Sequence, residues 1–350
     1  MNTVPKTSPG LKAFLAVCLL NGLLFFPILY QSYKHYDTRL TPWDVGAYMS
    51  LVDKPGEFEP PFRFRIIAPW LTRLMRAAPA YDIEINFTED PASKRDFFHF
   101  SILNAAFCVA VSAMLFLYLT KAMQARWAYL GSLLYLFSFY GVVTDIIPMT
   151  DTSCHFFIMA AILLFQARKP WAFALACLFG VFSKETMLIV LGGWIAIGSL
   201  KDRGVLRYLA YMLPAAAAYY AATRIWPAET EFNYYQPGFL EGRLFRAFNP
   251  REYNGSFIFH VFLSQAPFLL AIAAYAILKA KGALRDMRFV PEVWLFPFLI
   301  WLGMTLDLGN STGRVAYMAF PAMVQFQCMV LRAWTARYLP CLGESDPALS

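Results

Sequence analysis

The chain has 350 residues, of which 59% are hydrophobic and only 15% are charged. A water-soluble domain averages about 45–50% apolar and about 25% charged residues, so this composition excludes most soluble classes and indicates a membrane protein. The net charge of +7 does not indicate nucleic-acid binding, because the basic residues lie in short segments between apolar runs. The six cysteines show no spacing typical of disulfides or metal sites.

Ten apolar segments follow one another along the chain, and each is expected to form a membrane-crossing helix. They lie at residues 11–31, 97–120, 127–147, 152–167, 171–182, 187–200, 208–226, 256–278, 291–306 and 315–331. The first is too long for the apolar region of a signal peptide, and no small-residue cleavage site follows it, so we expect a retained helix. The predicted fold class is an all-α polytopic membrane protein with a single transmembrane domain, residues 1–350.

The basic residues predict the orientation of these helices. They occupy every second connection, including both termini, and those connections hold half of the 30 basic residues but only five of the 23 acidic ones. Short loops rich in Lys and Arg face the cytoplasm. We therefore expect both termini, with a tail at 332–350, in the cytoplasm of a bacterial inner membrane. The long connections 32–96 and 226–255 then lie on the outer face, and loops of this length are usually functional.

Two of the expected helices, 171–182 and 187–200, are short and flank the sequence Ser183-Lys184-Glu185-Thr186. At 1.5 Å per residue they reach only about 18–21 Å, less than a bilayer core of roughly 30 Å. The turn is therefore expected below the outer membrane surface, where charged residues indicate a functional site. The alternative is that Lys184 only forms an ion pair with Glu185 at the tip of the turn.

The first outer loop contains two further candidate features. Thr41, Pro42 and Asp44 match the start of a helix, so Asp44 either completes a capping box or is available for chemistry. Further on, the sequence Pro-Phe-Arg-Phe-Arg at 61–65 leads into an amphipathic segment that is expected to lie in the membrane interface. Its arginines either contact lipid headgroups or, through Arg63 or Arg65, bind a specific phosphate.

These features together resemble the GT-C superfamily of integral-membrane glycosyltransferases. The resemblance rests on an acidic residue soon after the first span, the Phe-Arg-Phe-Arg stretch, the Lys-Glu-Thr turn, and Gly313-Arg314 before Phe320-Pro321. It implies a hexosyl- or pentosyltransferase that moves a sugar from a polyprenyl-phosphate carrier to an envelope glycan, glycolipid or protein on the outer face, usually with inversion. The chain departs from many members in having fewer spans and no terminal soluble domain, which leaves a compact or a non-catalytic relative as alternatives.

The resemblance also implies roles for individual residues. A carboxylate in the first outer loop acts as the base; Asp44 matches it best by position, and Asp37 is the second candidate. Positive charge must stabilise the leaving phosphate. The candidates for that role are Lys184, Arg314, Arg63 and Arg65. Arg314 has the alternative of anchoring a helix end.

Four more residues are expected to support this site: Glu185, Tyr48, Asp145 and Asp151. Asp151 could instead be the N-cap of the span that follows it. Tyr48 could stack on a sugar or belong to an interfacial aromatic belt. No metal or other cofactor is expected. The alternative is Mg²⁺ or Mn²⁺, which some family members bind, held here by Asp44, Asp145 and Asp151.

Two other classes of function fit parts of the pattern. A transporter or flippase of a lipid-linked saccharide would place Lys184 and Arg314 in its path. Transporters typically have broken helices at matching positions in two halves, and this chain has one broken segment without a counterpart. A non-catalytic membrane scaffold would explain the spans but not the recessed charged turn.

Overall fold

The computed structural model describes residues 11–34, 43–54, 64–79, 91–198, 203–225, 249, 254–284, 290–305 and 311–339. Every regular element in these ranges is helical, and they contain no β-strand. By their internal contacts the residues divide into two compact units. One unit comprises Pro9–Met114 and Leu136–Phe239, and the other comprises Met1–Ser8, Leu115–Tyr135 and Leu240–Ser350.

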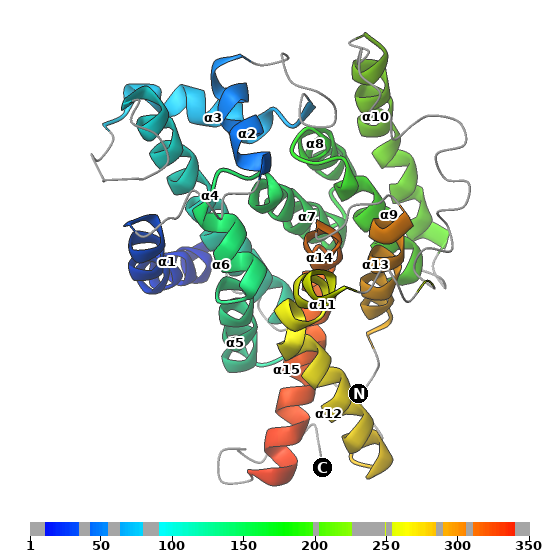
Figure 1. Cartoon of the computed structure of the whole chain (residues 1–350). Helices are drawn as coiled ribbons and strands as arrows, with labels where there is room; N and C mark the ends of the chain where they lie inside the picture. The colour runs from blue at the N-terminus through cyan, green and yellow to red at the C-terminus, as the bar shows by residue number, and fades with distance from the viewer. Residues whose placement is uncertain are drawn as a thin grey trace. The chain divides into compact units, whose positions relative to one another are not determined.

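The first unit contains most of the helices shown in blue to green in Figure 1. They are α1 (Leu11–Lys34), α2 (Trp43–Asp53), α3 (Ile67–Leu74) with the 3-10 turn η3 (Met75–Ala77), most of α4 (Pro91–Leu119), α6 (Phe139–Ile146), α7 (Asp151–Gln166), α8 (Pro170–Val181), α9 (Thr186–Gly198) and α10 (Arg203–Ile225). Helix α7 packs along α8, and α8 packs along α10.

The second unit contains the end of α4 and the helices of the C-terminal part. They are α5 (Ala125–Leu136), α11 (Gly255–Val261), η6 (Leu263–Gln265), α12 (Ala266–Ala280), η7 (Pro291–Trp294), α13 (Leu295–Thr305), α14 (Thr312–Tyr317) and α15 (Phe320–Tyr338). Helices α12 and α15 pack against each other, with the rings of Phe268 and Phe326 6.1 Å apart. Gly303 allows α13 to approach α14 closely, since an added Cβ would lie 2.7 Å from Thr312 Cγ2.

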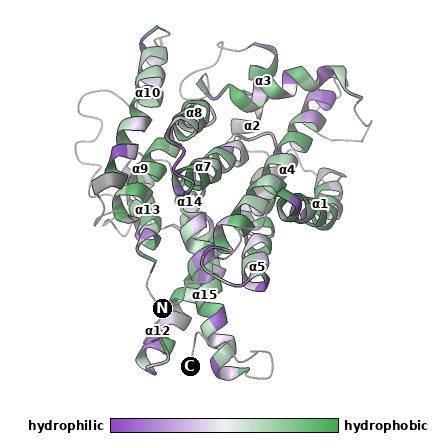
Figure 2. Cartoon of the chain, turned by 180° about the vertical axis from the view of Figure 1, so that it is seen from behind, coloured by the Kyte–Doolittle hydropathy of each residue, from purple (hydrophilic) through white to green (hydrophobic). Residues whose placement is uncertain are grey.

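Three helical segments of the described chain are long and apolar enough to cross a membrane: Leu11–Tyr30, Ser93–Leu119 and Gly255–Ala280. Shorter apolar helices lie at Asp151–Gln166, Pro170–Val181, Thr186–Ile197 and Pro291–Thr305. Helix α1 exposes Leu15, Leu19 and Leu23, and most of its ribbon has the green colour of hydrophobic residues in Figure 2. Exposed apolar surface of this extent indicates contact with a membrane. The described part of the chain is therefore all-helical and has the features of a membrane protein.

The ten apolar segments of the sequence all overlap helices, but three of them are interrupted. The segment 256–278 is divided between α11 and α12, with the 3-10 turn η6 between them. The segment 127–147 is divided between α5 and α6, because the Ser138 hydroxyl accepts a hydrogen bond from the Gly141 amide at 2.9 Å and starts a new helix there. The segment 315–331 is divided between α14 and α15, where Pro321 lies in the first turn of α15. The predicted break between 182 and 187 is confirmed, since α8 ends at Val181 and α9 begins at Thr186.

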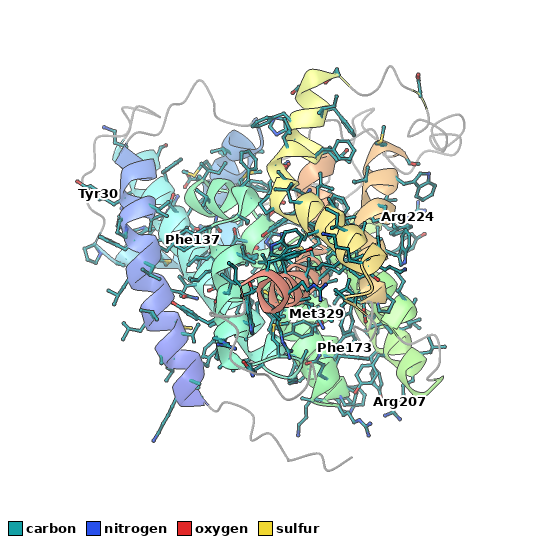
Figure 3. All side chains as sticks on the ribbon, turned by 90° about the horizontal axis from the view of Figure 1, so that it is seen from below. Tyr30, Phe137, Phe173, Arg207, Arg224 and Met329 are labelled. Carbon is teal, nitrogen blue, oxygen red and sulfur yellow. The ribbon has the colours of Figure 1, made fainter. Side chains whose placement is uncertain are left out.

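Aromatic side chains fill one end of the first unit. Tyr208 of α10 lies between Phe165 of α7 and Phe173 of α8. The centroid of its ring is 4.8 Å from that of Phe165 and 5.2 Å from that of Phe173. Figure 3 labels Phe173 together with Arg207 at this end of the bundle. This packing holds α7, α8 and α10 together. The α8–α9 turn follows directly after α8.

Candidate functional site

A buried ion pair joins the α8–α9 turn to the start of α7. Lys184 Nζ lies 2.5 Å from Asp151 Oδ1, and the side chains are only 6% and 2% exposed. Charged groups are rarely buried unless they are paired, because each loses its hydration. Lys184 is therefore buried inside the unit, with Asp151 as its partner.

A second ion pair begins on the next residue of the same turn. Arg65, just before α3, donates from Nη2 to Glu185 Oε1 at 2.6 Å and from Nε to Glu185 Oε2 at 3.1 Å. This is the two-point geometry in which a guanidinium binds a carboxylate most specifically. The two side chains are 9% and 20% exposed, so the pair lies largely inside the unit.

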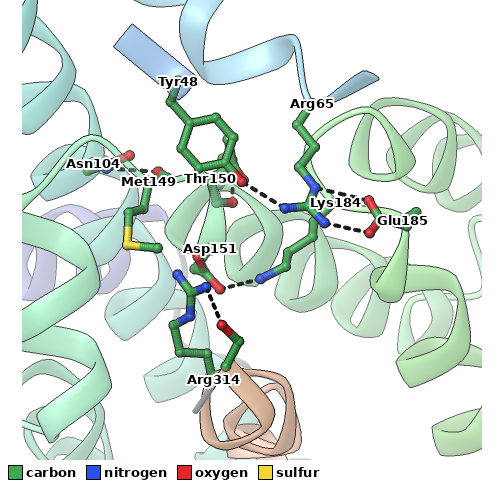
Figure 4. Close-up of polar contacts among 11 residues, drawn as sticks. Tyr48, Arg65, Asn104, Met149, Thr150, Asp151, Lys184, Glu185 and Arg314 are labelled. Atoms are coloured by element: carbon green, nitrogen blue, oxygen red, sulfur yellow. Dashed lines mark hydrogen bonds and ion pairs between the residues drawn. The ribbon is translucent and has the colours of Figure 1, made fainter. Parts of the chain in front are cut away.

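Two hydrogen bonds to Tyr48 of α2 close the arrangement. The Tyr48 oxygen accepts from Arg65 Nη1 at 2.8 Å and from Thr150 Oγ1 at 3.1 Å. Thr150 and Asp151 are neighbours in the sequence, and so are Lys184 and Glu185. Together with the hydrogen bonds and ion pairs described above, these two peptide links connect six residues into a closed loop (Figure 4). We call this set the polar circuit: Tyr48, Arg65, Thr150, Asp151, Lys184 and Glu185.

Asn104 of α4 places the Thr150–Asp151 side of the circuit. Its amide nitrogen donates to the carbonyls of Ile147 and Met149 at 2.8 and 2.9 Å, which fixes the connection between α6 and α7. The backbone of Thr150 then accepts the first hydrogen bond of α7, from the Cys154 amide at 3.1 Å. Asp151 is the first residue of α7, where the helix dipole favours a negative charge.

The α8–α9 turn is placed by two close approaches. Gly180, near the end of α8, has no room for a side chain, because an added Cβ would collide with Met187 Sδ and lie 2.9 Å from Phe157 Cβ. On the other side, the Ile67 amide donates to the Phe182 carbonyl at 3.4 Å and attaches the start of α3 to the turn. This contact brings Arg65 within reach of Glu185.

Helix α2 is held against α4 by packing and by a second set of charges. Tyr48, Leu51 and Val52 of α2 pack with Phe100 of α4 in a buried apolar cluster. Beyond it, Arg76 donates to Asp53 and, at 2.6 Å, to Asp96 Oδ2. The hydrogen bonds to Asp96 and Asp53 hold the pKa of Arg76 above its usual range. The orientation of α2 is thus fixed at both ends of this contact.

The charges of the polar circuit cancel, since two cations face two carboxylates. Burial alone would raise the pKa of Glu185, but the charge and hydrogen bonds of Arg65 outweigh it and hold this pKa below its ordinary value. Burial acts on Arg65 in the opposite sense, yet Glu185 and Tyr48 keep the pKa of its guanidinium raised. Arg65 and Glu185 are therefore both ionised near neutral pH. An anionic ligand that entered here would require additional positive charge.

The remaining residues expected from the sequence lie as follows. Asp44 is in the first turn of α2, four residues before Tyr48, and its side chain lies outside the described residues. The same holds for the side chain of Asp145 in α6. Asp37 and Arg63 lie outside the described ranges altogether. Arg314 belongs to the other unit, in α14, where Nη2 donates to Ser311 Oγ at 2.9 Å.

The structure decides several of the alternatives that the sequence left open. The alternative of an ion pair between Lys184 and Glu185 is wrong, because Lys184 pairs with Asp151 and Glu185 pairs with Arg65. The N-cap role of Asp151 is also wrong, since Thr150 precedes the first helical residue. Headgroup contact is wrong for Arg65, which is buried against Glu185.

Two further findings concern Tyr48 and Thr150. Stacking of Tyr48 on a sugar is wrong, because its ring is 1% exposed and packs inside the α2–α4 cluster. Thr150 was not singled out from the sequence, where nothing distinguishes it from other hydroxyl residues near helix starts.

A metal site gains no support in the part of the chain that is described. No group of three or more His, Cys, Asp or Glu side chains there could hold a metal ion. Of the three carboxylates considered for Mg²⁺ or Mn²⁺, Asp151 binds the Lys184 ammonium, and the other two have side chains outside the described residues.

Comparison with known proteins gives no relative from which a function could be transferred. No family model matches the chain, and neither a curated protein nor a solved structure is significantly similar to it. The arguments for its function therefore rest on the residues themselves.

Proposed function

We propose that this chain is an integral-membrane glycosyltransferase of the GT-C type, which transfers a hexose or pentose from a polyprenyl-phosphate donor to an acceptor on the outer face of a bacterial inner membrane. The acceptor is a glycan, glycolipid or protein of the cell envelope. In this proposal the chain crosses the membrane ten times, with both termini in the cytoplasm. The three interrupted segments are then crossings built from two shorter α-helices each.

One observation carries the proposal: the contact between Arg65 and Glu185. These residues belong to the Phe-Arg-Phe-Arg stretch and the Lys-Glu-Thr turn, two of the sequence features that resemble the family. They are 120 residues apart in the chain, yet they meet next to the helix that carries Asp44. Two resembling features that pack into one buried polar cluster support a common site.

The proposed chemistry assigns a separate task to each charged group. Asp44 accepts the proton of the acceptor hydroxyl as its oxygen attacks the anomeric carbon of the sugar. The bond from that carbon to the phosphate oxygen breaks, and the phosphate leaves with the electron pair. Lys184 and Arg65 stabilise the negative charge that grows on the phosphate, an effect that is strong where water is excluded.

The charge balance of the polar circuit adds a requirement. Because Asp151 and Glu185 already neutralise Lys184 and Arg65, a bound phosphate would leave excess negative charge unless further cations take part. The sequence predicts Arg63 and Arg314 as these additional cations.

The test uses the purified chain in lipid nanodiscs, with radiolabelled undecaprenyl-phosphate-linked hexoses and pentoses and an acceptor extract of the cell envelope. Wild-type protein is expected to transfer one of these sugars. Asp44→Asn is expected to lower the rate by about 100-fold or more, as is usual when a general base is removed. Asp37→Asn is the comparison that decides between the two carboxylates.

Cation variants complete the design. Lys184→Met is expected to abolish transfer, whereas Lys169→Met at the exposed start of α8 is expected to leave it unchanged. Absence of transfer from every donor would overturn the proposal. If the wild-type protein instead moves the intact lipid-linked saccharide across proteoliposome membranes, the chain is a transporter.

A further inference from the structure

The hydroxyl of Tyr48 connects two parts of the polar circuit, and the proposed chemistry gives this hydroxyl no task. It is the point at which Arg65 and the Thr150–Asp151 segment meet. It is the contact through which the described side chains of α2 enter the polar circuit. The helix that carries Asp44 is therefore linked to both buried ion pairs through the Tyr48 oxygen.

We infer that Tyr48 is a positioning residue of the reaction: its hydroxyl aims the Arg65 guanidinium and holds α2 in register with the α8–α9 turn. This inference rests on the proposed function, and it assigns Tyr48 a role in catalysis without contact to the sugar. The ring is buried in an apolar cluster, so only the oxygen takes part.

The geometry at Arg65 supports this role. Glu185 binds Nε and Nη2 along one edge of the guanidinium plane, and Tyr48 binds Nη1 on another side. Two contacts along one edge leave the group able to swing with the Glu185 side chain, whereas a third contact from a different helix fixes the direction of the fork. Helix α2, whose Tyr48 side chain supplies this contact, is itself linked to α4 by Arg76, which donates to Asp53 of α2 and to Asp96 of α4.

The position of Asp44 is coupled to the polar circuit through helix α2. Asp44 lies one helical turn before Tyr48, and residues four apart occupy the same side of a helix. A rotation or shift of α2 that moved residue 44 would therefore also strain the hydrogen bonds from Tyr48 to Arg65 and Thr150. The circuit thus keeps the base and the cations in one arrangement.

Tyr48→Phe tests the inference, because it keeps the buried ring and removes only the oxygen. The chain offers a matched control in Tyr220→Phe: the Tyr220 hydroxyl also accepts from an arginine, Arg224 Nε at 3.0 Å, but at an exposed position on α10. Both variants are compared with wild type in the nanodisc transfer assay, with kcat and KM for the undecaprenyl-phosphate-linked sugar measured separately.

For Tyr48→Phe, kcat is expected to fall by about 10- to 100-fold, the effect typical of losing a hydrogen bond to a charged group. KM for the donor is expected to change by less than about 3-fold, because ground-state binding of the donor is retained. Tyr220→Phe is expected to leave both constants unchanged. A merely structural role of Tyr48 would lower the amount of folded protein without separating kcat from KM.

Thr150→Val provides a second variant, which opens the circuit at a different contact and leaves the Arg65–Tyr48 hydrogen bond in place. It is expected to lower kcat less than Tyr48→Phe does, and Thr150→Ser is expected to restore it. Wild-type kcat and KM in both Tyr48→Phe and Thr150→Val would overturn the inference while leaving the proposed function intact. Absence of transfer by the wild-type protein would instead overturn the proposed function.

Discussion

The buried pair of Lys184 and Asp151 makes the most demanding prediction about stability. Lys184→Met retains the aliphatic part of the side chain but removes the ammonium group, so the Asp151 carboxylate stays buried without its cation. Removing one partner of a buried pair costs about 3–5 kcal/mol. Because both side chains are almost completely inaccessible, we expect a loss of folding stability within that range.

The double variant separates the pair from its surroundings. Replacing both charges with apolar groups of similar size is often close to neutral, so Lys184→Met combined with Asp151→Leu is expected to regain at least about 2 kcal/mol of the loss. The coupling is read from a double-mutant cycle, since contacting residues do not contribute additively.

The assay is reversible denaturant unfolding of the purified protein in detergent micelles, followed by circular dichroism. Lys169→Met is the control, because Lys169 is exposed at the other end of α8 and should change stability by less than about 0.5 kcal/mol. Wild-type stability in Lys184→Met, or a double variant no more stable than the single one, would refute the reasoning.

Three further predictions concern the supports of the site. The pKa of Glu185 is lower in the folded chain than its ordinary value. The stability that Glu185 contributes is therefore complete above the ordinary carboxyl pKa of about 4.3 and is lost as the pH falls through the folded pKa. Glu185→Gln should reduce this loss of stability at low pH, and an unchanged loss would contradict the assignment. Gly180→Ala should cost about 1–3 kcal/mol through overpacking, whereas Gly192→Ala, whose new Cβ would meet its nearest neighbour only at 3.9 Å, should be neutral or stabilising in the same unfolding assay. Asn104→Ala should cost about 1–3 kcal/mol, because two buried carbonyls lose their donor; a smaller loss would show that the α6–α7 connection is fixed by other contacts.

Local sequence signals account for the helices and for the break that presents Lys184. Runs of apolar residues are read directly as helices, and the Ser-Lys-Glu-Thr interruption is visible because four polar residues stand between two apolar runs. The break at Ser138 was missed, since one serine between aromatic residues does not interrupt an apolar pattern. It became a helix start only through its hydrogen bond to Gly141.

The partners of the charged residues could not be found in this way. Lys184 and Glu185 are neighbours in sequence, so pairing them was the local solution, but their actual partners lie 33 and 120 residues away. Which distant residue meets each charge depends on how α2, α3 and α7 pack around the turn. That packing is set by contacts such as Ile67 to Phe182 and Asn104 to Met149, which carry no periodic or compositional signal.

The central claim is that this chain adds a sugar to the cell envelope and that Asp44 is needed for the reaction. Mass spectrometry of envelope glycans tests it most directly, in cells that lack the protein and in cells that carry Asp44→Asn or Tyr220→Phe in its place. We predict that the same single sugar is missing from the first two strains and present in the third. Identical glycans in all strains, or a complete glycan in the Asp44→Asn cells, would contradict the account.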